Sequence, residues 1–216
     1  MLPWPGIPHV RAMAFEMSLS CDDVCVQRAG KDVLAGVSLS LAPGEAVMLR
    51  GPNGSGKTSM LRAVAGLASF DGEIVFSRGV QVLDPAFIRA HEIHMVSPEG
   101  GLSPRLTVRE TARFLGAFYG RDPGESLGQL GLEKQGHLRV GDLSTGQRRR
   151  LSLLRLLISP RALWLLDEPF AALDEEGKEI VRALIDIHRA RGGLVMLALH
   201  DREALPSAKT LFVEAA

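Results

Sequence analysis

The chain has 216 residues, of which 46% are hydrophobic, so it is long enough for one well-packed domain. Lys and Arg together number 25, as do Asp and Glu, and the formal net charge at pH 7 is zero. No overall charge therefore draws the chain to nucleic acid or to an anionic membrane surface, and we expect no nucleic-acid partner.

Residues 1–17 contain three prolines and lack the continuous apolar core of a signal peptide. We expect a leader that is disordered or foreign to the natural protein, followed by one domain over residues 18–216. No run of about 18 apolar residues indicates a membrane span. The two cysteines, Cys21 and Cys25, lie four apart in the first expected strand, where they would share a face, and they do not suggest a disulfide framework. We therefore expect the chain to remain in the cytoplasm.

The first elements in chain order are strands. Short apolar and β-branched runs over residues 19–41 are separated by the turn signal at 29–32, which predicts an antiparallel pair. Residues 46–49 are apolar throughout, which is typical of a strand buried on both faces. A helix is expected over residues 58–67, because apolar residues recur there on one helical face.

Helices and buried strands then alternate to the end of the chain. Strand patterns at 73–76 and 93–96 precede a stretch of helical spacing from 107 to about 136, which we assign to a small helical subdomain over about residues 100–150. The remaining elements are a helix at 144–158, a strand at 162–166, a helix at 175–191 and a strand at 194–199. The expected fold is α/β, with a mostly parallel sheet core, an antiparallel β subdomain and the helical subdomain.

A glycine-rich motif lies between the buried strand at 46–49 and the next helix. It reads Gly51-Pro52-Asn53-Gly54-Ser55-Gly56-Lys57-Thr58 and fits G-x-x-x-x-G-K-[ST], the phosphate-binding loop of P-loop NTPases. Backbone N–H groups and the helix N-terminus would bind the phosphates of ATP, Lys57 would reach the β and γ phosphates, and Thr58 would ligate Mg²⁺. We include the following residue, Ser59, in the nucleotide-binding set.

Two adjacent carboxylates, Asp167 and Glu168, follow the apolar strand at 162–166. The carboxyl edge of a parallel sheet is where α/β proteins bind ligands. Asp167 suits the Mg²⁺ shell, and Glu168, pointing to the other face, suits polarisation of the attacking water. An Asp-Glu pair before a helix is also ordinary N-terminal capping chemistry, and only the phosphate-binding loop favours the catalytic interpretation.

The class of NTPase comes from a third motif. Leu143-Ser144-Thr145-Gly146-Gln147 resembles the ABC signature Leu-Ser-Gly-Gly-Gln, with Thr145 in place of the first glycine. Ser144 and the Gly146 backbone at a helix N-terminus form a second phosphate-binding surface, although an ordinary helix cap would look similar. Ala172-Leu173-Asp174 resembles the D-loop, and Leu199-His200-Asp201 resembles the switch histidine of the same family.

The chain thus resembles ABC nucleotide-binding subunits over roughly residues 19–213, which implies the P-loop NTPase fold of the ABC ATPase type. The resemblance implies a head-to-tail homodimer in which the loop of one chain and the Ser144 surface of the other enclose ATP. His200 would contact the γ-phosphate beside Lys57 and Glu168, and Asp174 would couple the two sites. The partners would be integral-membrane permease subunits, with this chain peripheral at the cytoplasmic face of the inner membrane.

Two positions depart from the family pattern. Arg28 occupies the place of the aromatic that usually stacks on adenine; a guanidinium can also stack on a base, but a solvated arginine is an equal alternative. The glutamine of the Q-loop is missing, and Glu99 is our candidate replacement, because a carboxylate can supply an oxygen near Mg²⁺ or water. Its alternative is a loop charge in solvent. The basic run 148–150 continues the signature helix, where consecutive side chains point in different directions, which disfavours a nucleic-acid patch.

Within the family, the amino-acid sequence of residues 56–62, 163–167 and 190–195 is similar to that of the ATP-binding subunit of the haem exporter complex of bacterial cytochrome c maturation. That resemblance implies ATP-driven handling of haem, with residues 102–119 as the docking surface for the permease; a solvated helical hairpin without a partner is the alternative there. Another small ABC exporter or importer, a soluble P-loop ATPase and a P-loop kinase remain as further alternatives.

Overall fold

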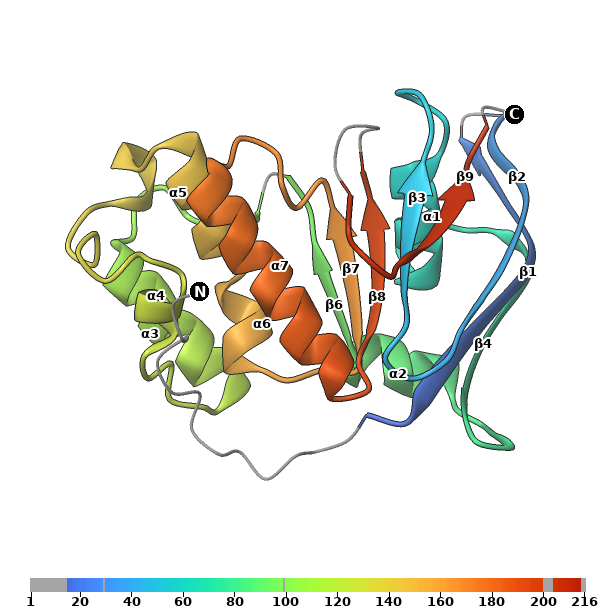
Figure 1. Cartoon of the computed structure of the whole chain (residues 1–216), viewed down its shortest axis with the longest axis horizontal. Helices are drawn as coiled ribbons and strands as arrows, with labels where there is room; N and C mark the ends of the chain where they lie inside the picture. The colour runs from blue at the N-terminus through green and yellow to red at the C-terminus, as the bar shows by residue number, and fades with distance from the viewer. Residues whose placement is uncertain (1–14, 29, 99, 200–203, 215–216) are drawn as a thin grey trace.

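The computed structural model describes residues 15–28, 30–98, 100–199 and 204–214. Over this part of the chain a parallel sheet lies in the middle of the molecule (Figure 1), with the helices α3 to α7 on one side and α1 with an antiparallel sheet on the other. None of the helices in the described ranges is long and apolar enough to cross a membrane.

The central sheet consists of five parallel strands in the described residues. All residues of β7 and β8 are buried, which is why these strands are apolar along their whole length rather than alternating. Because the strands are parallel, the chain leaves β3 and β7 at the same edge of the sheet. In spatial order the strands are β6 (Ile93–Val96), β7 (Leu163–Asp167), β8 (Leu194–Ala198), β3 (Ala46–Arg50) and β9 (Lys209–Phe212).

The second sheet is antiparallel, as expected for residues 19–41. Its strands, in spatial order, are β2 (Lys31–Leu41), β1 (Met17–Arg28), β4 (Asp71–Arg78) and β5 (Gln81–Val82). The expectation that Cys21 and Cys25 share a face is wrong, because the register of β1 shifts between Cys21 and Val24. Asp23 has φ 50° at this irregularity, and the buried residues change from odd to even positions. Cys21 is therefore buried, whereas Cys25 lies half-buried on the opposite face.

The expected helix over 144–158 is two helices that meet at Leu153. The Ser152 hydroxyl donates to the carbonyl of Arg149 at 2.7 Å, the kind of side-chain bond that bends helices. Residues 85–91, which we left without an element, form a helix that starts at the Asp84 cap and Pro85. The helices are α1 (Lys57–Val64), α2 (Pro85–His91), α3 (Val108–Tyr119), α4 (Ser126–Gln129), α5 (Thr145–Ser152), α6 (Leu154–Ile158) and α7 (Glu175–Ala190), with a 3-10 turn at Val140–Asp142.

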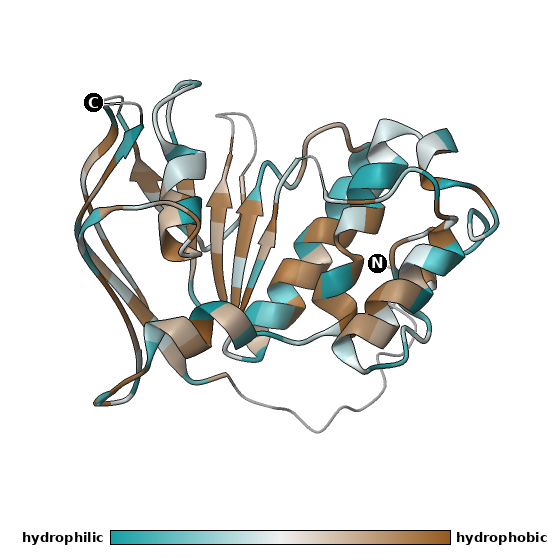
Figure 2. Cartoon of the chain, turned by 180° about the vertical axis from the view of Figure 1, so that it is seen from behind, coloured by the Kyte–Doolittle hydropathy of each residue, from teal (hydrophilic) through white to brown (hydrophobic). Residues whose placement is uncertain are grey.

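Two apolar cores lie on the two faces of the central sheet. Alternate residues of β7 divide between them: Trp164 and Leu166 pack with the helical side, and Leu163 and Leu165 with α1 and the antiparallel sheet. Figure 2 shows the central strands mostly in brown, whereas the helices carry brown and teal bands in turn. The hydrophobic pattern of the sequence thus reflects a sheet covered on both faces.

The first strand begins before residue 18, where we expected the domain to start after a leader over residues 1–17. Met17 is the first residue of β1 and is 1% exposed. Phe15 donates its N–H to the carbonyl of Arg191 at 2.8 Å, and its ring lies 5.4 Å from that of His188. Phe15 thus packs at the end of α7, and Met17 lies in the core on the side of the antiparallel sheet, so both belong to the folded domain.

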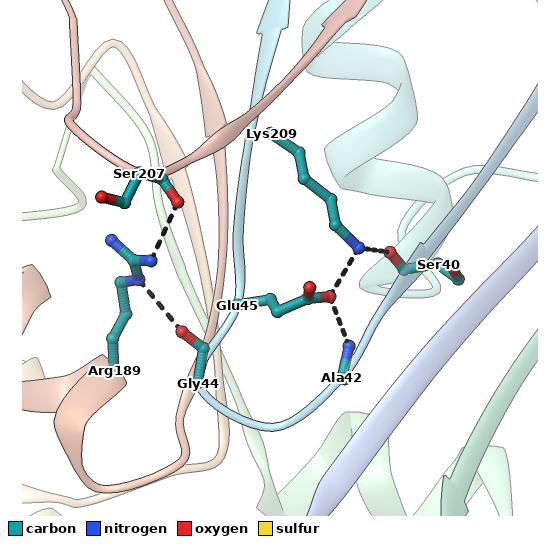
Figure 3. Close-up of polar contacts among 7 residues, drawn as sticks. All are labelled: Ser40, Ala42, Gly44, Glu45, Arg189, Ser207 and Lys209. Atoms are coloured by element: carbon teal, nitrogen blue, oxygen red, sulfur yellow. Dashed lines mark hydrogen bonds and ion pairs between the residues drawn. The ribbon is translucent and has the colours of Figure 1, made fainter.

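Two basic side chains, those of Arg189 and Lys209, bind the segment after residue 203 to the neighbouring strands (Figure 3). Arg189 at the end of α7 donates to the carbonyls of Gly44 at 3.0 Å and Ser207 at 3.1 Å. Lys209 in β9 donates to Glu45 at 2.6 Å and to the Ser40 carbonyl at 3.0 Å. The Lys209 hydrogen bond lowers the pKa of Glu45. These bonds support the pairing of β9 with β3. Val213, the residue after β9, then lies against Gly51 of the glycine-rich loop.

Candidate functional site

The glycine-rich loop leaves β3 and enters α1 in a conformation that depends on glycine. Gly51, Gly54 and Gly56 have φ of 145°, 84° and 95°. A Cβ on Gly51 would lie 2.1 Å from the Val213 carbonyl oxygen, and one on Gly56 would lie 2.2 Å from that of Val33. The loop is therefore wedged between the end of β9 and the start of β2, and no larger residue fits at either position.

The loop presents backbone and side-chain donors suited to phosphate. Among the described residues, no side chain caps the N-terminus of α1 at Gly56, so the first N–H groups of the helix can bind an anion. The Lys57 ammonium donates to the carbonyls of Gly51 at 2.7 Å and Pro52 at 2.8 Å and lies over the loop. The Ser55 hydroxyl is fully buried and has no hydrogen-bond partner among the described residues. A phosphate oxygen in the loop would satisfy it.

Thr58 and Asp167, the two residues predicted to ligate Mg²⁺, meet at the carboxyl edge of the sheet. The Thr58 hydroxyl lies 3.1 and 3.0 Å from the two carboxylate oxygens of Asp167. Burial raises the pKa of Asp167, the Thr58 hydrogen bond opposes this, and the neighbouring Glu168 charge raises it further. A divalent cation would offset both the burial and the like charge.

Residues for a metal ion at this point are few. No group of three His, Cys, Asp or Glu side chains that could hold a metal occurs in the described part of the chain. An ion between Thr58 and Asp167 would therefore take its other ligands from phosphate oxygens and water, which is how Mg²⁺ is usually held in nucleotide sites. The donor set is all oxygen and fits Mg²⁺ rather than a softer metal.

Glu168 sits in an unusual backbone conformation directly after β7. Its φ is 50°, and its N–H donates to the Ala198 carbonyl at 3.0 Å. A left-handed conformation at a residue other than glycine costs free energy, and such positions concentrate at functional sites. The Glu168 residue is half-buried, and its charge acts on the neighbouring Asp167.

The signature segment lies far from the loop within one chain. Figure 1 shows α5 and α1 on opposite sides of the central strands. Ser144 caps α5: its hydroxyl accepts from the N–H of Gln147 at 3.1 Å, and the Gln147 side chain accepts from the N–H of Ser144 at 2.9 Å. Ser144 and Thr145 are exposed, and Gly146 packs so closely that a Cβ would lie 2.8 Å from the Ala172 carbonyl oxygen. The structure does not bring this surface to the loop of its own chain.

The remaining predicted residues lie at the edges of the site or outside the described residues. Asp174 is exposed and caps α7, accepting from the N–H of Gly177 at 2.9 Å. Arg28 is exposed at the end of β1, in the hairpin whose other strand contacts Gly56 through Val33. Glu99 and His200 lie outside the described residues. Their predicted roles stay predictions.

Sequence reasoning missed Arg149, which the basic run 148–150 concealed. Its side chain is 5% exposed and donates to the carbonyls of Ser97 at 2.6 Å and of Asp167. Burial lowers the pKa of Arg149, and the charges of Asp167 and Glu168 oppose that shift. The available signal was the helix period, which must turn one residue of three consecutive arginines toward the sheet.

Comparison with known proteins gives a consistent result. The family described as ABC transporter matches residues 34–171. The cytochrome c biogenesis ATP-binding export protein CcmA of Roseobacter denitrificans is 41% identical over 199 residues, which cover 91% of each chain. Its counterpart in Bradyrhizobium diazoefficiens is 43% identical over 188 residues, covering 85% of this chain and 92% of that one. In fold, the structure is similar to an ATP-binding ABC transporter protein of Pyrococcus furiosus, with a TM-score of 0.78, 21% identity, and coverage of 92% and 100% of the two chains.

Proposed function

The chain belongs to the ABC transporter family of ATP-binding proteins, and we propose that it is the ATP-hydrolysing subunit of the haem exporter complex of cytochrome c biogenesis. ATP hydrolysis is the general activity of this family, and its members power membrane permeases. The assignment to cytochrome c biogenesis rests on the names of the relatives, which share about 40% of their residues with this chain over most of its length.

One observation carries the nucleotide chemistry: the loop, its lysine and the Thr58–Asp167 pair lie at one edge of the sheet. We assign Lys57 and the loop N–H groups to the phosphates of ATP, with Thr58 and Asp167 holding Mg²⁺. The ion would neutralise charge that develops on the phosphates. Glu168, the half-buried carboxylate next to Asp167, then orients and deprotonates the attacking water, because hydrolysis needs a carboxylate near the γ-phosphate that is not a metal ligand.

The position of Ser144 supports a shared site. Ser144 caps an exposed helix N-terminus that lies across the sheet from the loop of its own chain. This helix N-terminus is suited to bind ATP that is held by the loop of a second copy of the chain. We propose a head-to-tail homodimer with two ATP molecules, each between the loop of one chain and Ser144 of the other. Asp174 lies beside this interface. His200 contacts the γ-phosphate, and Glu99 takes the place of the Q-loop glutamine, which responds to the permease. Arg28 lies against the base.

The permease is proposed to dock on residues 102–119. This segment contains α3, whose Phe114 and Phe118 are 60% and 70% exposed one helical turn apart. Two large apolar side chains exposed together on one helix face are typical of an interaction surface. The chain would then act as a peripheral protein at the cytoplasmic face of the inner membrane, held there by integral-membrane subunits.

The function is tested in a bacterium in which this gene is replaced by its Lys57→Ala variant. We expect c-type cytochromes to lose covalently bound haem, measured by haem staining of membrane proteins. The wild-type chain should co-purify with integral-membrane proteins, and a Phe114→Ser, Phe118→Ser double variant should not. Normal haem attachment in the Lys57→Ala strain would exclude cytochrome c biogenesis, and loss of another transport activity would indicate a different ABC exporter or importer.

A further inference from the structure

The buried guanidinium of Arg149 joins the ends of two neighbouring strands. It extends from α5 and donates to the carbonyl of Ser97, the residue after β6, at 2.6 Å, and to the carbonyl of Asp167, the last residue of β7. Its Nε has no hydrogen-bond partner among the described residues. The planar fork of arginine can hold two carbonyls at fixed directions, which lysine cannot.

Stability alone does not account for a cation at this position. Two carbonyl oxygens satisfy hydrogen bonds but leave the charge itself uncompensated, and removing a charge from water is costly. Well-packed apolar side chains of similar volume often serve a buried position equally well or better. The negative charges acting on the Arg149 guanidinium are those of Asp167 and Glu168, which are the carboxylates assigned to Mg²⁺ and to the attacking water.

A second arginine donates to the carbonyl of a residue three positions after Ser97. Arg155 in α6 donates to the carbonyl of Gly100 at 2.9 Å. Gly100 has φ 68°, and a Cβ there would lie 2.9 Å from the side chain of Ser152. Helices α5 and α6 thus each donate one arginine hydrogen bond to a backbone carbonyl, α5 to that of Ser97 and α6 to that of Gly100.

We propose that Arg149 is a positioning residue for hydrolysis, which ties the carbonyl of Asp167 to α5, the helix that Ser144 caps, and to the carbonyl of Ser97. Asp167 and Glu168 are consecutive, so fixing this carbonyl fixes the peptide plane between them and hence the direction of the Glu168 carboxylate. The helix that meets the nucleotide of the second chain is thereby linked to the hydrolytic carboxylate of its own chain. This inference rests on the proposed ATP hydrolysis.

The test compares steady-state ATP hydrolysis of the purified full-length chain with that of Arg149→Met, Arg149→Lys and Arg149→Ala. We expect KM for ATP to change by about twofold or less and kcat to fall about 30- to 100-fold in the Met variant, as small misplacements of catalytic groups do. Arg149→Lys should recover little of this loss. Ethylguanidinium ion added to Arg149→Ala should raise its kcat severalfold, whereas ethylammonium ion should not.

The matched control is Arg150→Ala, which removes the next arginine of α5, a residue that donates instead to the Leu130 carbonyl at 3.2 Å. It should keep kcat within about twofold. Thermal melting of each variant separates loss of folded protein from loss of kcat. Wild-type kcat in Arg149→Met, or a loss of kcat that follows melting temperature and is not rescued by ethylguanidinium, would overturn the proposal. If the wild-type chain itself fails to hydrolyse ATP, the proposed function fails first, and this inference with it.

Discussion

The hydroxyl of Thr58 lies 3.1 and 3.0 Å from the two carboxylate oxygens of Asp167, a residue 109 positions further along the chain. The contact joins the start of α1 to the end of β7 because β3 and β7 are parallel and the chain leaves both at one edge of the sheet. It places a hydroxyl and a carboxylate where a cation bound to loop phosphates would be held. The nucleotide site therefore depends on the topology of the sheet as much as on either motif.

Thr58→Val should weaken the use of Mg²⁺. The variant keeps the shape of the side chain but removes the oxygen that would ligate the ion, so we expect the Mg²⁺ concentration for half-maximal ATP hydrolysis to rise about tenfold. Thr111→Val is the control, because the Thr111 hydroxyl donates to the Thr107 carbonyl at the start of α3, away from the glycine-rich loop. An unchanged Mg²⁺ requirement in Thr58→Val would remove Thr58 from the metal site.

Lys57→Ala should weaken ATP binding. Loss of a charge-assisted bond to phosphate costs about 1.5–3 kcal/mol, or about a 10- to 150-fold rise in Kd measured with a fluorescent ATP analogue. Lys134→Ala removes an exposed lysine of the helical subdomain and should leave Kd unchanged. Equal affinities of wild type and Lys57→Ala would contradict the assignment of the loop.

Glu168→Gln should stop hydrolysis while ATP still binds. Glutamine keeps the size of the side chain but cannot accept the proton of water, and a general base contributes about 10²- to 10⁴-fold to the rate. Phosphate release in a single turnover measures the effect, and Glu133→Gln, in an exposed loop, serves as the control. Residual turnover near the wild-type level would mean that another group activates water.

Two buried histidines should make the fold sensitive to mild acid. Burial lowers the pKa of His188 to about 4 and that of His94 to about 3, below the value near 6.5 expected in the unfolded chain. Below about pH 6.5 the unfolded chain binds more protons than the folded one, so the free energy of unfolding decreases as pH falls toward 4. Each histidine should contribute on the order of 2 kcal/mol between pH 7 and pH 5.

Urea unfolding of His188→Gln at these two pH values isolates one histidine. His188 stacks on Trp164 with ring centroids 3.9 Å apart, so the variant should be less stable at pH 7 but should lose less stability on acidification. The exposed His137→Gln should show the wild-type pH dependence. The same loss on acidification in all three proteins would show that His188 does not remain neutral when folded.

Strong periodicity made most of the fold predictable. The continuous apolar runs of β7 and β8 and the apolar face of α7 each identify one kind of element, and the observed bounds differ from the expected ones by one residue or none. The short β9 was missed because three of its four residues are exposed, so no apolar pattern marks it. The irregularity in β1 between Cys21 and Val24 was missed because a bulge has no signal in local hydrophobicity.

The candidate site likewise contains residues that the sequence predicts and one that it does not. Residues of the loop, Asp167 and Glu168 were identifiable because phosphate chemistry requires particular residue types at fixed spacing. Arg149 was not, because its role depends on which side of α5 faces the sheet and on two carbonyls distant in the sequence. Spacing alone therefore predicts the groups that would touch nucleotide, and tertiary structure was needed to find Arg149, which we propose orients them.

The central claim is that one chain holds half of each ATP site, and mixing two inactive variants tests it most directly. Ser144→Arg damages only the signature surface and Lys57→Ala only the loop, so each variant alone should hydrolyse little ATP. Their equimolar mixture contains heterodimers with one intact composite site, and turnover should rise to about a quarter of the wild-type rate if dimers form at random. No gain on mixing, or full activity of Ser144→Arg alone, would contradict the shared site.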